Sequence, residues 1–194
     1  MPEHSRLNLM KKLFELLKIL RNKVISHSES FICSSCGKSH SGIPMDLGFN
    51  APFYWNPERE ENNPNSRLTS DTCIINNQDF FVRGILEIPV IDGPRTFRYG
   101  VWVSLSEKNF KRYMEIFGTQ KELEEPEYFG WFSNMLKGYE SKTLELKTNV
   151  RLQGGNNRPF IILEHTDHPL SKEQHHGITM HRVREIIEIN NVTK

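Results

Sequence analysis

The residues best suited to chemistry in this 194-residue chain are two cysteines and a histidine that lie close together in the sequence. Cys33 and Cys36 are separated by two residues, Gly37 follows at once, and His40 lies four positions after the second cysteine. Zn²⁺ prefers a tetrahedral shell of thiolate and imidazole, and a tight Cys-x-x-Cys-Gly turn can aim both sulfurs at one centre. Cys73 is the one remaining cysteine. The spacing therefore predicts a structural zinc ion held by Cys33, Cys36, His40 and Cys73.

Three alternatives to this zinc site stay open. His168 could replace His40 as the fourth ligand. The cysteine pair could be a redox dithiol, although such pairs usually open a helix and the Gly and Ser residues here disfavour one. The cysteines could also be buried thiols without metal. If four protein ligands close the shell, the zinc is structural, because catalysis needs an open position.

A cluster of histidines gives a second source of chemistry. Five of the eight histidines lie between residues 165 and 181, where Asp167 and His168 are neighbours after a predicted strand. A histidine beside a carboxylate can bind metal or transfer protons. The sequence contains no His-Glu-x-x-His pattern to strengthen this hypothesis. A metal-dependent hydrolase with a site near Asp167 and His168 is therefore the alternative function, and whether the protein is an enzyme stays open.

A predicted β-hairpin carries a third candidate site. Apolar and polar residues alternate over 80–91 and again over 97–104, with turn residues at 92–95. If that turn sets the register, Ile85 lies opposite Trp102. A missing side chain at a glycine of either strand would let another backbone or a ligand approach.

The outward face of this hairpin collects charged and aromatic side chains. Arg83, Glu87, Arg98 and Trp102 share one predicted face. One interpretation is a groove that binds a ligand or peptide through Arg83, Glu87 and Trp102, with His168 as a further ligand-binding candidate. The other is a cross-strand ion pair beside a glycine bulge.

The elements around these sites predict an α+β fold. The expected elements are helices at 106–117, 171–174 and 179–189, strands at 143–152 and 159–164, a short aromatic helix or turn at 128–136, and loops through most of 31–70. Strands and helices run in blocks without strict alternation, so we expect an antiparallel sheet with packed helices, preceded by a zinc-knuckle-like segment.

An amphipathic helix is expected at residues 5–26, where leucines form one stripe and basic residues outnumber the single acid, Glu15. We assign residues 1–28 to this helix and a linker, and 29–194 to a single α+β domain. Such a stripe needs a cover, which predicts a homodimer through residues 5–26; docking on the domain or on an anionic membrane is the alternative.

Composition narrows the function classes. The net charge is +1 and the mean hydropathy is −0.56, so the chain lacks the excess of positive charge that nonspecific nucleic-acid binding needs. No apolar stretch reaches the roughly 18 residues of a membrane span. Three cysteines do not make a disulfide framework, and a reducing cytoplasm is the expected location.

The chain also resembles a known family. Its matching motifs are Cys33-x-x-Cys36-Gly37-x-x-His40, Pro52-x-Tyr54, Asp71-x-Cys73, Phe81-x-Arg83-Gly84-x-Leu86-Glu87-Ile88-Pro89, Gly100-Val101-Trp102-Val103-Ser104, Phe129-Gly130-Trp131, Arg158-Pro159 and Asp167-His168-Pro169-Leu170. Over about residues 31–190 these are similar to the bacterial family called domain of unknown function 2199. The resemblance implies a small soluble bacterial domain and supplies no activity. We therefore expect a zinc-stapled cytoplasmic binding or interaction module for an unknown protein or small molecule.

Overall fold

The computed structural model of the protein describes residues 30–32, 39–93 and 95–191. The chain divides into two units, Met1–Pro44 and Met45–Lys194.

In the first unit, β1 (Ser30–Ile32) and β2 (Ser39–Ser41) pair as antiparallel strands, and the backbone of His40 lies opposite Phe31. Residues 33–38 between them, which include Cys33 and Cys36, lie outside the described residues. The helix predicted at 5–26, the boundary near residue 28 and the dimer through that helix also fall outside the described residues and stay predictions.

The second unit is a mixed α+β domain, as predicted. Its elements in chain order are β3 (Asp46–Gly48), α2 (Pro57–Glu60), β4 (Arg67–Leu68), β5 (Thr72–Ile75), β6 (Asp79–Pro89), β7 (Thr96–Leu105), α3 (Glu107–Ile116), the 3-10 helix η1 (Gln120–Glu124), β8 (Tyr128–Phe132), β9 (Lys147–Arg151), β10 (Phe160–Leu163), α4 (Pro169–His176) and α5 (Met180–Asn191).

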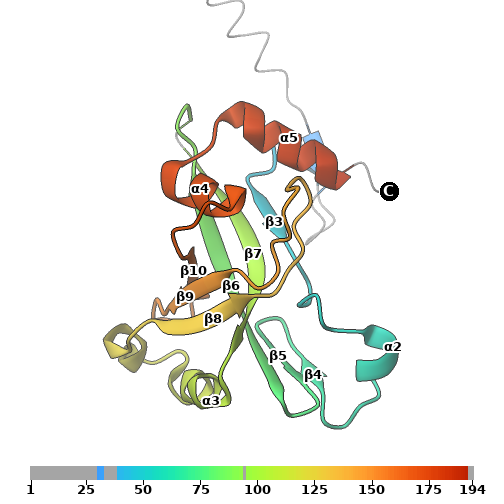
Figure 1. Ribbon diagram of the computed structural model, residues 1–194, viewed down its shortest axis with the longest axis vertical. Helices are drawn as coiled ribbons and strands as arrows, with labels where there is room; N and C mark the ends of the chain where they lie inside the picture. The colour runs from blue at the N-terminus through green and yellow to red at the C-terminus, as the bar shows by residue number, and fades with distance from the viewer. Residues whose placement is uncertain (1–29, 33–38, 94, 192–194) are drawn as a thin grey trace, which may run out of the picture. The chain divides into compact units, whose positions relative to one another are not determined.

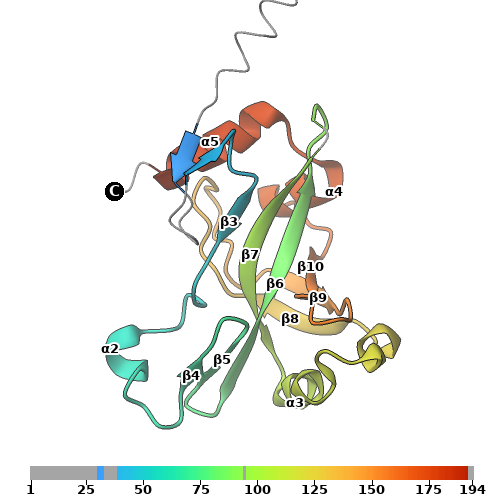
Figure 2. The ribbon, with the colours of Figure 1, turned by 180° about the vertical axis from the view of Figure 1, so that it is seen from behind.

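Five strands of this unit close into a ring. β6 pairs with β7, β7 with β8, β8 with β9, β9 with β10, and β10 returns to β6, as the two ribbon views show (Figure 1, Figure 2). Chain direction reverses at every antiparallel pairing, and an odd number of strands cannot alternate all the way around. One pairing must be parallel, and it is β10 with β6. β3 also runs parallel to β7, so the sheet is mixed, and the prediction of an antiparallel sheet is wrong in this respect.

Alternate side chains of the five strands fill the inside of the ring, as the period of a strand requires. The buried apolar residues of this set are Phe80, Val82, Leu86, Ile88, Phe97, Tyr99, Val101, Val103, Leu105, Tyr128, Phe132, Val150, Ile161 and Leu163. Gly84 belongs to the same set, and a Cβ there would lie 2.4 Å from Ile161 Cδ1 and 2.8 Å from the carbonyl oxygen of Pro159. The predicted close approach of another backbone is therefore found at Gly84.

Helices cover the two ends of the ring, with α3 at one end and α4 and α5 at the other (Figure 1). α3 begins as predicted, because the Ser106 hydroxyl accepts a hydrogen bond from the backbone N–H of Asn109. The Thr179 hydroxyl likewise accepts from the N–H of Arg182 at the start of α5. α4 begins earlier than predicted, because the His168 ring, in place of Ser171, provides its cap.

Two local predictions are wrong. Residues 128–136 begin with the strand β8 and not a helix or turn: Tyr128 and Phe132 are buried while Phe129 and Trp131 are more than 40% exposed, which is the alternation of a strand. The stretch 31–70, predicted as loops, contains four short strands and α2. Elements of two to four residues leave almost no periodic signal in a sequence.

The hairpin of β6 and β7 forms as predicted, but its register is shifted by two residues. Ile85 lies opposite Gly100, and Arg83 lies opposite Trp102. Val90, which directly follows β6, bridges Ile178 and does not pair with β7, so the connecting loop spans residues 90–95 and is longer than the predicted turn at 92–95. Local turn residues cannot reveal a pairing with a segment almost 90 positions away.

A second core lies outside the ring, on the outer face of β6 and β7. Trp102, Cys73, Ile75 and Phe81 are buried together there, and the side chains packed against them are Phe49, Trp55 and Leu68. The Trp102 indole N–H donates to the carbonyl oxygen of Phe49 at 2.9 Å. We call this group the outer core.

Asn134 ties the covering segment to the ring. Its side-chain oxygen accepts from the backbone N–H of Trp102 at 2.7 Å, and its Nδ2 donates to the carbonyl oxygen of Ala51 at 3.0 Å. The residue is 2% exposed, so water is not available as a substitute partner for either group. One amide therefore holds both β7 and the segment that covers Trp102.

Asn134→Ala should lower the free energy of unfolding by about 2–6 kcal/mol, because the Trp102 N–H and the Ala51 carbonyl each lose a partner, at about 1–3 kcal/mol per group. Urea unfolding followed by tryptophan fluorescence measures this. Asn149→Ala, on the partly exposed outer face of β9, is the control and should change stability by under about 0.5 kcal/mol. Equal effects of the two substitutions would contradict the bridging role of Asn134.

Candidate functional site

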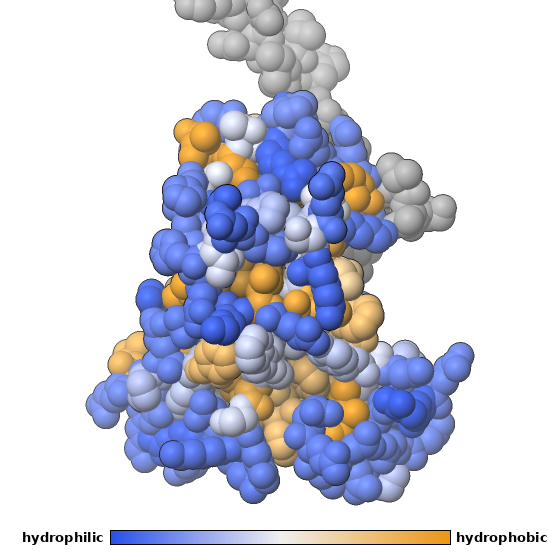
Figure 3. Space-filling view, viewed as in Figure 1, coloured by the Kyte–Doolittle hydropathy of each residue, from blue (hydrophilic) through white to orange (hydrophobic). Residues whose placement is uncertain are grey.

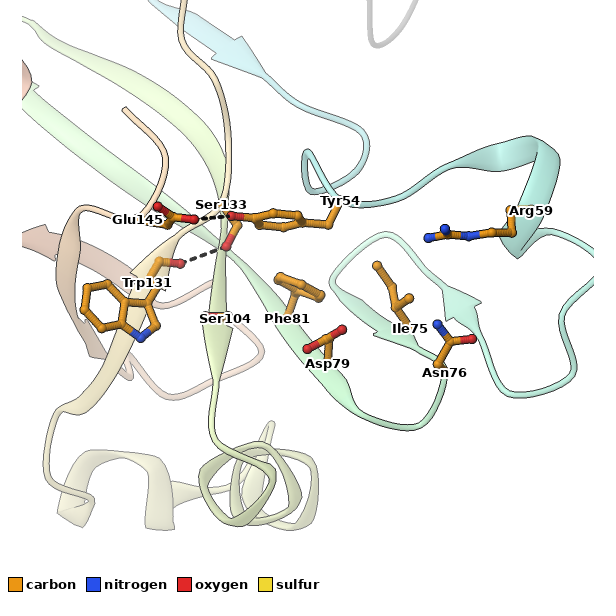
Figure 4. A pocket seen from close by; sticks show the side chains of 10 residues that line it. All are labelled: Tyr54, Arg59, Ile75, Asn76, Asp79, Phe81, Ser104, Trp131, Ser133 and Glu145. Carbon is orange, nitrogen blue, oxygen red and sulfur yellow. Dashed lines mark hydrogen bonds between the residues drawn. The ribbon is translucent and has the colours of Figure 1, made fainter. Parts of the chain in front are cut away.

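An open cleft of about 810 Å³ lies beside the outer core, on the outer face of the sheet (Figure 4). The residues that line it come from four strands, from α2 and from loops far apart in the sequence: Tyr54, Arg59, Ile75, Asn76, Asp79, Phe81, Ser104, Trp131, Ser133 and Glu145. Across this side of the molecule, hydrophobic surface gathers between hydrophilic flanks (Figure 3). Since folding tends to bury such surface, a cleft of this make-up is the first candidate for a binding site.

The floor of the cleft is set by strand register. Phe81 pairs with Ser104, and Ser104 pairs with Trp131, so these three side chains form one row across β6, β7 and β8. Trp131 is 42% exposed and makes an edge-to-face contact with Phe129, with ring centroids 5.0 Å apart. The row therefore presents the Trp131 ring beside a small hydroxyl residue, while the Phe81 ring on the other side of Ser104 is 3% exposed.

Tyr54 forms the wall above this floor. Its ring stacks on Phe81 with centroids 6.0 Å apart, and it makes an edge contact with Phe53 at 5.7 Å. Its hydroxyl donates to Glu145 Oε1 at 3.4 Å, across the mouth of the cleft (Figure 4). Partial burial raises the pKa of the Tyr54 hydroxyl, and the Glu145 carboxylate raises it further. The hydroxyl therefore stays protonated and able to donate.

The backbone at Glu145 is in the left-handed region, with φ at +65°. This conformation costs a residue with a Cβ about 1–2 kcal/mol, and glycine adopts it freely. The hydrogen bond from the Glu145 N–H to the carbonyl oxygen of Phe132, at 2.8 Å, anchors it there. The carboxylate is thus held at the cleft mouth by an unfavourable backbone conformation. Such conformations are frequent at functional sites.

Charge in the cleft favours a positively charged ligand. Asp79 and Glu145 contribute two carboxylates. The positive charge of Arg59 is already engaged, because its Nε donates to the buried Glu60 carboxylate at 2.6 Å. Lys142 lies 3.1 Å from Glu145 at an exposed position, where such a pair is weak. The cleft can therefore offer carboxylates and ring faces to the same ligand.

Comparison with known proteins gives a family. The family model described as "Uncharacterized protein conserved in bacteria (DUF2199)" matches residues 32–178, which is most of the chain. The chain belongs to the DUF2199 family. No curated protein and no solved structure matches it. None of the helices described in this DUF2199 chain is both long enough and apolar enough to cross a membrane.

The hairpin residues predicted as a ligand site lie in three different environments. Trp102 is fully buried in the outer core, where it packs and does not face solvent. Glu87 lies opposite Arg98 and accepts from its Nε at 2.9 Å, which is the cross-strand ion pair of the alternative interpretation. Arg83 lies on the same face, partly buried, with few partners.

Asp167 and His168 each serve the start of α4. The Asp167 carboxylate lies 2.9 Å from Lys172 Nζ, and this hydrogen bond lowers the pKa of Asp167. His168 Nδ1 accepts from the N–H of Leu170 at 3.1 Å and so caps the helix. In residues 30–32, 39–93 and 95–191, no group of three or more His, Cys, Asp or Glu side chains is arranged to hold a metal ion.

Of the predicted zinc ligands, Cys73 is the one whose side chain is described. It is fully buried in the outer core against Ile75, Phe81 and Trp102. Burial raises the pKa of its thiol to about 12, because an apolar surrounding disfavours the thiolate, and the Glu60 carboxylate adds to the effect. In this DUF2199 domain the Cys73 thiol is buried among apolar side chains, and its role as a zinc ligand stays a prediction.

The residues that define the cleft were not among the predicted site residues. Tyr54 and Glu145 are 91 positions apart, and only the fold brings them together. Trp131 was part of a matching family motif, and its alternation with buried neighbours was the signal that could have placed it on an exposed strand face. The left-handed backbone of Glu145 has no signal in the sequence.

The raised pKa of Cys73 predicts a loss of stability at alkaline pH. Above its ordinary value of 9.0 the thiol ionises in the unfolded chain, whereas in the folded chain it stays protonated to about pH 12. The folded state binds the extra proton, so stability falls as the pH rises between these values. Between about pH 8 and about pH 10.5 the wild type should lose about 2 kcal/mol more than Cys73→Ala, at 1.36 kcal/mol per pH unit above the unfolded value.

Urea unfolding at several pH values measures this difference. The effect of tyrosine ionisation on the free energy of unfolding is common to both proteins and cancels when the two profiles are subtracted. Parallel pH profiles for the wild type and Cys73→Ala would contradict a buried, protonated thiol.

Proposed function

We propose that the protein is a binding module whose ligand presents a positively charged group to the cleft between Tyr54, Trp131 and Glu145. The single observation that carries this proposal is the Glu145 carboxylate, held beside exposed aromatic rings by a backbone conformation that disfavours its side chain. An ammonium or guanidinium group suits such a place, since ring faces and a carboxylate attract it together.

The exposed fractions of the rings support this role. Tyr54 is 40% exposed and Trp131 is 42% exposed, although both belong to ordered contacts with other aromatic side chains. A cation over the face of an exposed ring gains about 0.5–1 kcal/mol, and more when water is excluded. Two rings and a carboxylate around one cleft would therefore give a weak but selective site for one basic side chain or a small organic cation.

The groups in the cleft suit recognition. Its described lining contains carboxylates, hydroxyls, an amide and aromatic rings, and neither histidine nor cysteine is among those residues. The Ser133 hydroxyl is engaged with the carbonyl oxygen of Trp131 at 2.8 Å, so it is not poised as a nucleophile. An interaction module therefore describes the site better than a hydrolase does.

A structural zinc ion is the second part of the proposal, supported by the spacing of Cys33, Cys36 and His40. Cys36→Ser should release metal and lower the melting temperature, as measured by elemental analysis and thermal unfolding. Cys73→Ala tests whether Cys73 is the fourth zinc ligand. If the variant keeps its metal but is less stable, Cys73 only packs in the outer core. If the variant loses its metal, Cys73 is a ligand. Wild-type protein that is fully stable and free of metal would contradict the zinc site.

N-acetyl-arginine amide is a suitable probe of the cleft, with the uncharged N-acetyl-citrulline amide as its matched control. The arginine probe should shift the Trp131 indole signal in NMR titrations of the full chain, and the citrulline probe should do so far more weakly. Glu145→Gly should weaken this binding by about tenfold, equivalent to about 1.4 kcal/mol. The same variant should keep or raise the free energy of unfolding by about 0–1 kcal/mol, because glycine relieves the left-handed backbone.

Trp131→Ala, followed by the backbone amide signals of Tyr54 and Glu145, should also weaken binding, whereas Met114→Ala, an exposed change on α3, should leave it intact. Equal affinity for the charged and uncharged probes, or wild-type affinity in Glu145→Gly, would contradict the proposal.

A further inference from the structure

Arg83 occupies an unusual place on the outer face of the hairpin. Its guanidinium lies over two glycines on neighbouring strands, Gly48 of β3 and Gly100 of β7. A Cβ at Gly48 would lie 2.9 Å from Arg83 Nη2, and a Cβ at Gly100 would lie 3.5 Å from the same atom. A side chain at Gly48 would displace the guanidinium. The absence of side chains at Gly48 and Gly100 therefore allows the Arg83 guanidinium to lie against these two strands.

The guanidinium has few partners for its five N–H donors. Its Nε is buried and has no hydrogen-bond partner among the described residues. Its Nη1 reaches the carbonyl oxygen of Ser70 at 3.5 Å, the limit of a hydrogen bond. A partly buried arginine with so little compensation is costly to the folded state.

The nearest carboxylate, Asp71, compensates the charge of Arg83 only in part. Asp71 is engaged elsewhere, since it accepts from Arg158 Nε at 2.6 Å and from the Ser70 hydroxyl. Burial tends to raise the pKa of Asp71, but these two hydrogen bonds lower it overall, so the carboxylate stays ionised. Burial lowers the pKa of Arg83 and the nearby Arg158 lowers it further, whereas the Asp71 carboxylate opposes these two effects without cancelling them.

A second cleft, of about 620 Å³, is bounded in part by Asp71 and Arg158, the two charged side chains that interact with Arg83. It is lined by Asp71, Ile85, Glu87, Arg98, Phe117, Gln153, Asn156, Asn157, Arg158 and Phe160. The charged side chains that line this cleft are Arg98, Arg158, Asp71 and Glu87. Together with Arg83 they make three arginines and two carboxylates. Arg98 is paired with Glu87, and Arg158 with Asp71, so one positive charge, that of Arg83, is left over.

We propose that Arg83, with Arg158 beside it, binds one oxyanion group of a ligand, either a carboxylate or a phosphate. The planar guanidinium fork matches both groups with two parallel hydrogen bonds. An oxyanion there would satisfy donors that lack partners in the free protein and would relieve the repulsion between the two arginines. The site is separate from the cleft at Glu145, and the two proposals stand or fall independently.

NMR of the arginine Nε–H groups in the full chain tests the proposal, with inorganic phosphate and acetate as separate probes. At least one probe should shift the Arg83 and Arg158 signals in a saturable way and raise the melting temperature. Response to phosphate alone identifies a phosphate site, and response to both identifies a general carboxylate and phosphate site. Absence of a saturable shift with either probe overturns the proposal.

Variants separate binding from structure. Arg83→Gln should melt at the same temperature as the wild type or higher without probe, and should lose the stabilisation by the anion. Arg67→Gln removes the same charge from an exposed position on β4 and should respond as the wild type does. Arg83→Lys keeps the positive charge but lacks the planar guanidinium that makes two parallel hydrogen bonds. This variant should bind the anion about tenfold more weakly. Wild-type binding in Arg83→Gln overturns the proposal; if that variant does not fold, wild-type binding in Arg83→Lys overturns it.

Discussion

Closure of five strands into a ring is the constraint on which the rest of this structure depends. A closed ring buries one face of every strand in a single interior, and its odd number of strands forces the parallel contact of β10 with β6. The narrow interior of the ring requires glycine at position 84, because a Cβ there would clash with Ile161. All other chemistry of the second unit is therefore carried by the outward-facing residues and by the loops that cover them.

The outer face of β6 and β7 is divided by the outer core. Trp102 is buried at its centre under the segment that Asn134 and the indole hydrogen bond hold in place. Phe81, at the edge of this core, lies in the floor of a cleft that carries carboxylates. Arg83, opposite Trp102, interacts with Asp71 and Arg158, which line a second cleft. One strand thus contributes to two candidate sites of opposite charge. A buried tryptophan separates them.

The sequence predicted what local patterns encode. The hairpin, α3 with its Ser106 cap, and the strands that became β9 and β10 follow from alternation and capping over a few residues. Ring closure, the bridge of Val90 to Ile178 in the hairpin loop, and the meeting of Tyr54 with Glu145 all depend on contacts between distant segments. The predicted groove residues shared a face, but which of them is buried depended on the loop that covers Trp102.

The aromatic and acidic cleft is proposed to receive a cation. Intermolecular NOEs between the methyl protons of tetramethylammonium and the protein test this claim most directly, because they report which rings the cation touches. We expect NOEs to the rings of Trp131 and Tyr54, and none to Phe97 or Tyr99 inside the ring of strands. Contacts with neither Trp131 nor Tyr54, or contacts spread evenly over the exposed aromatic side chains, would contradict it.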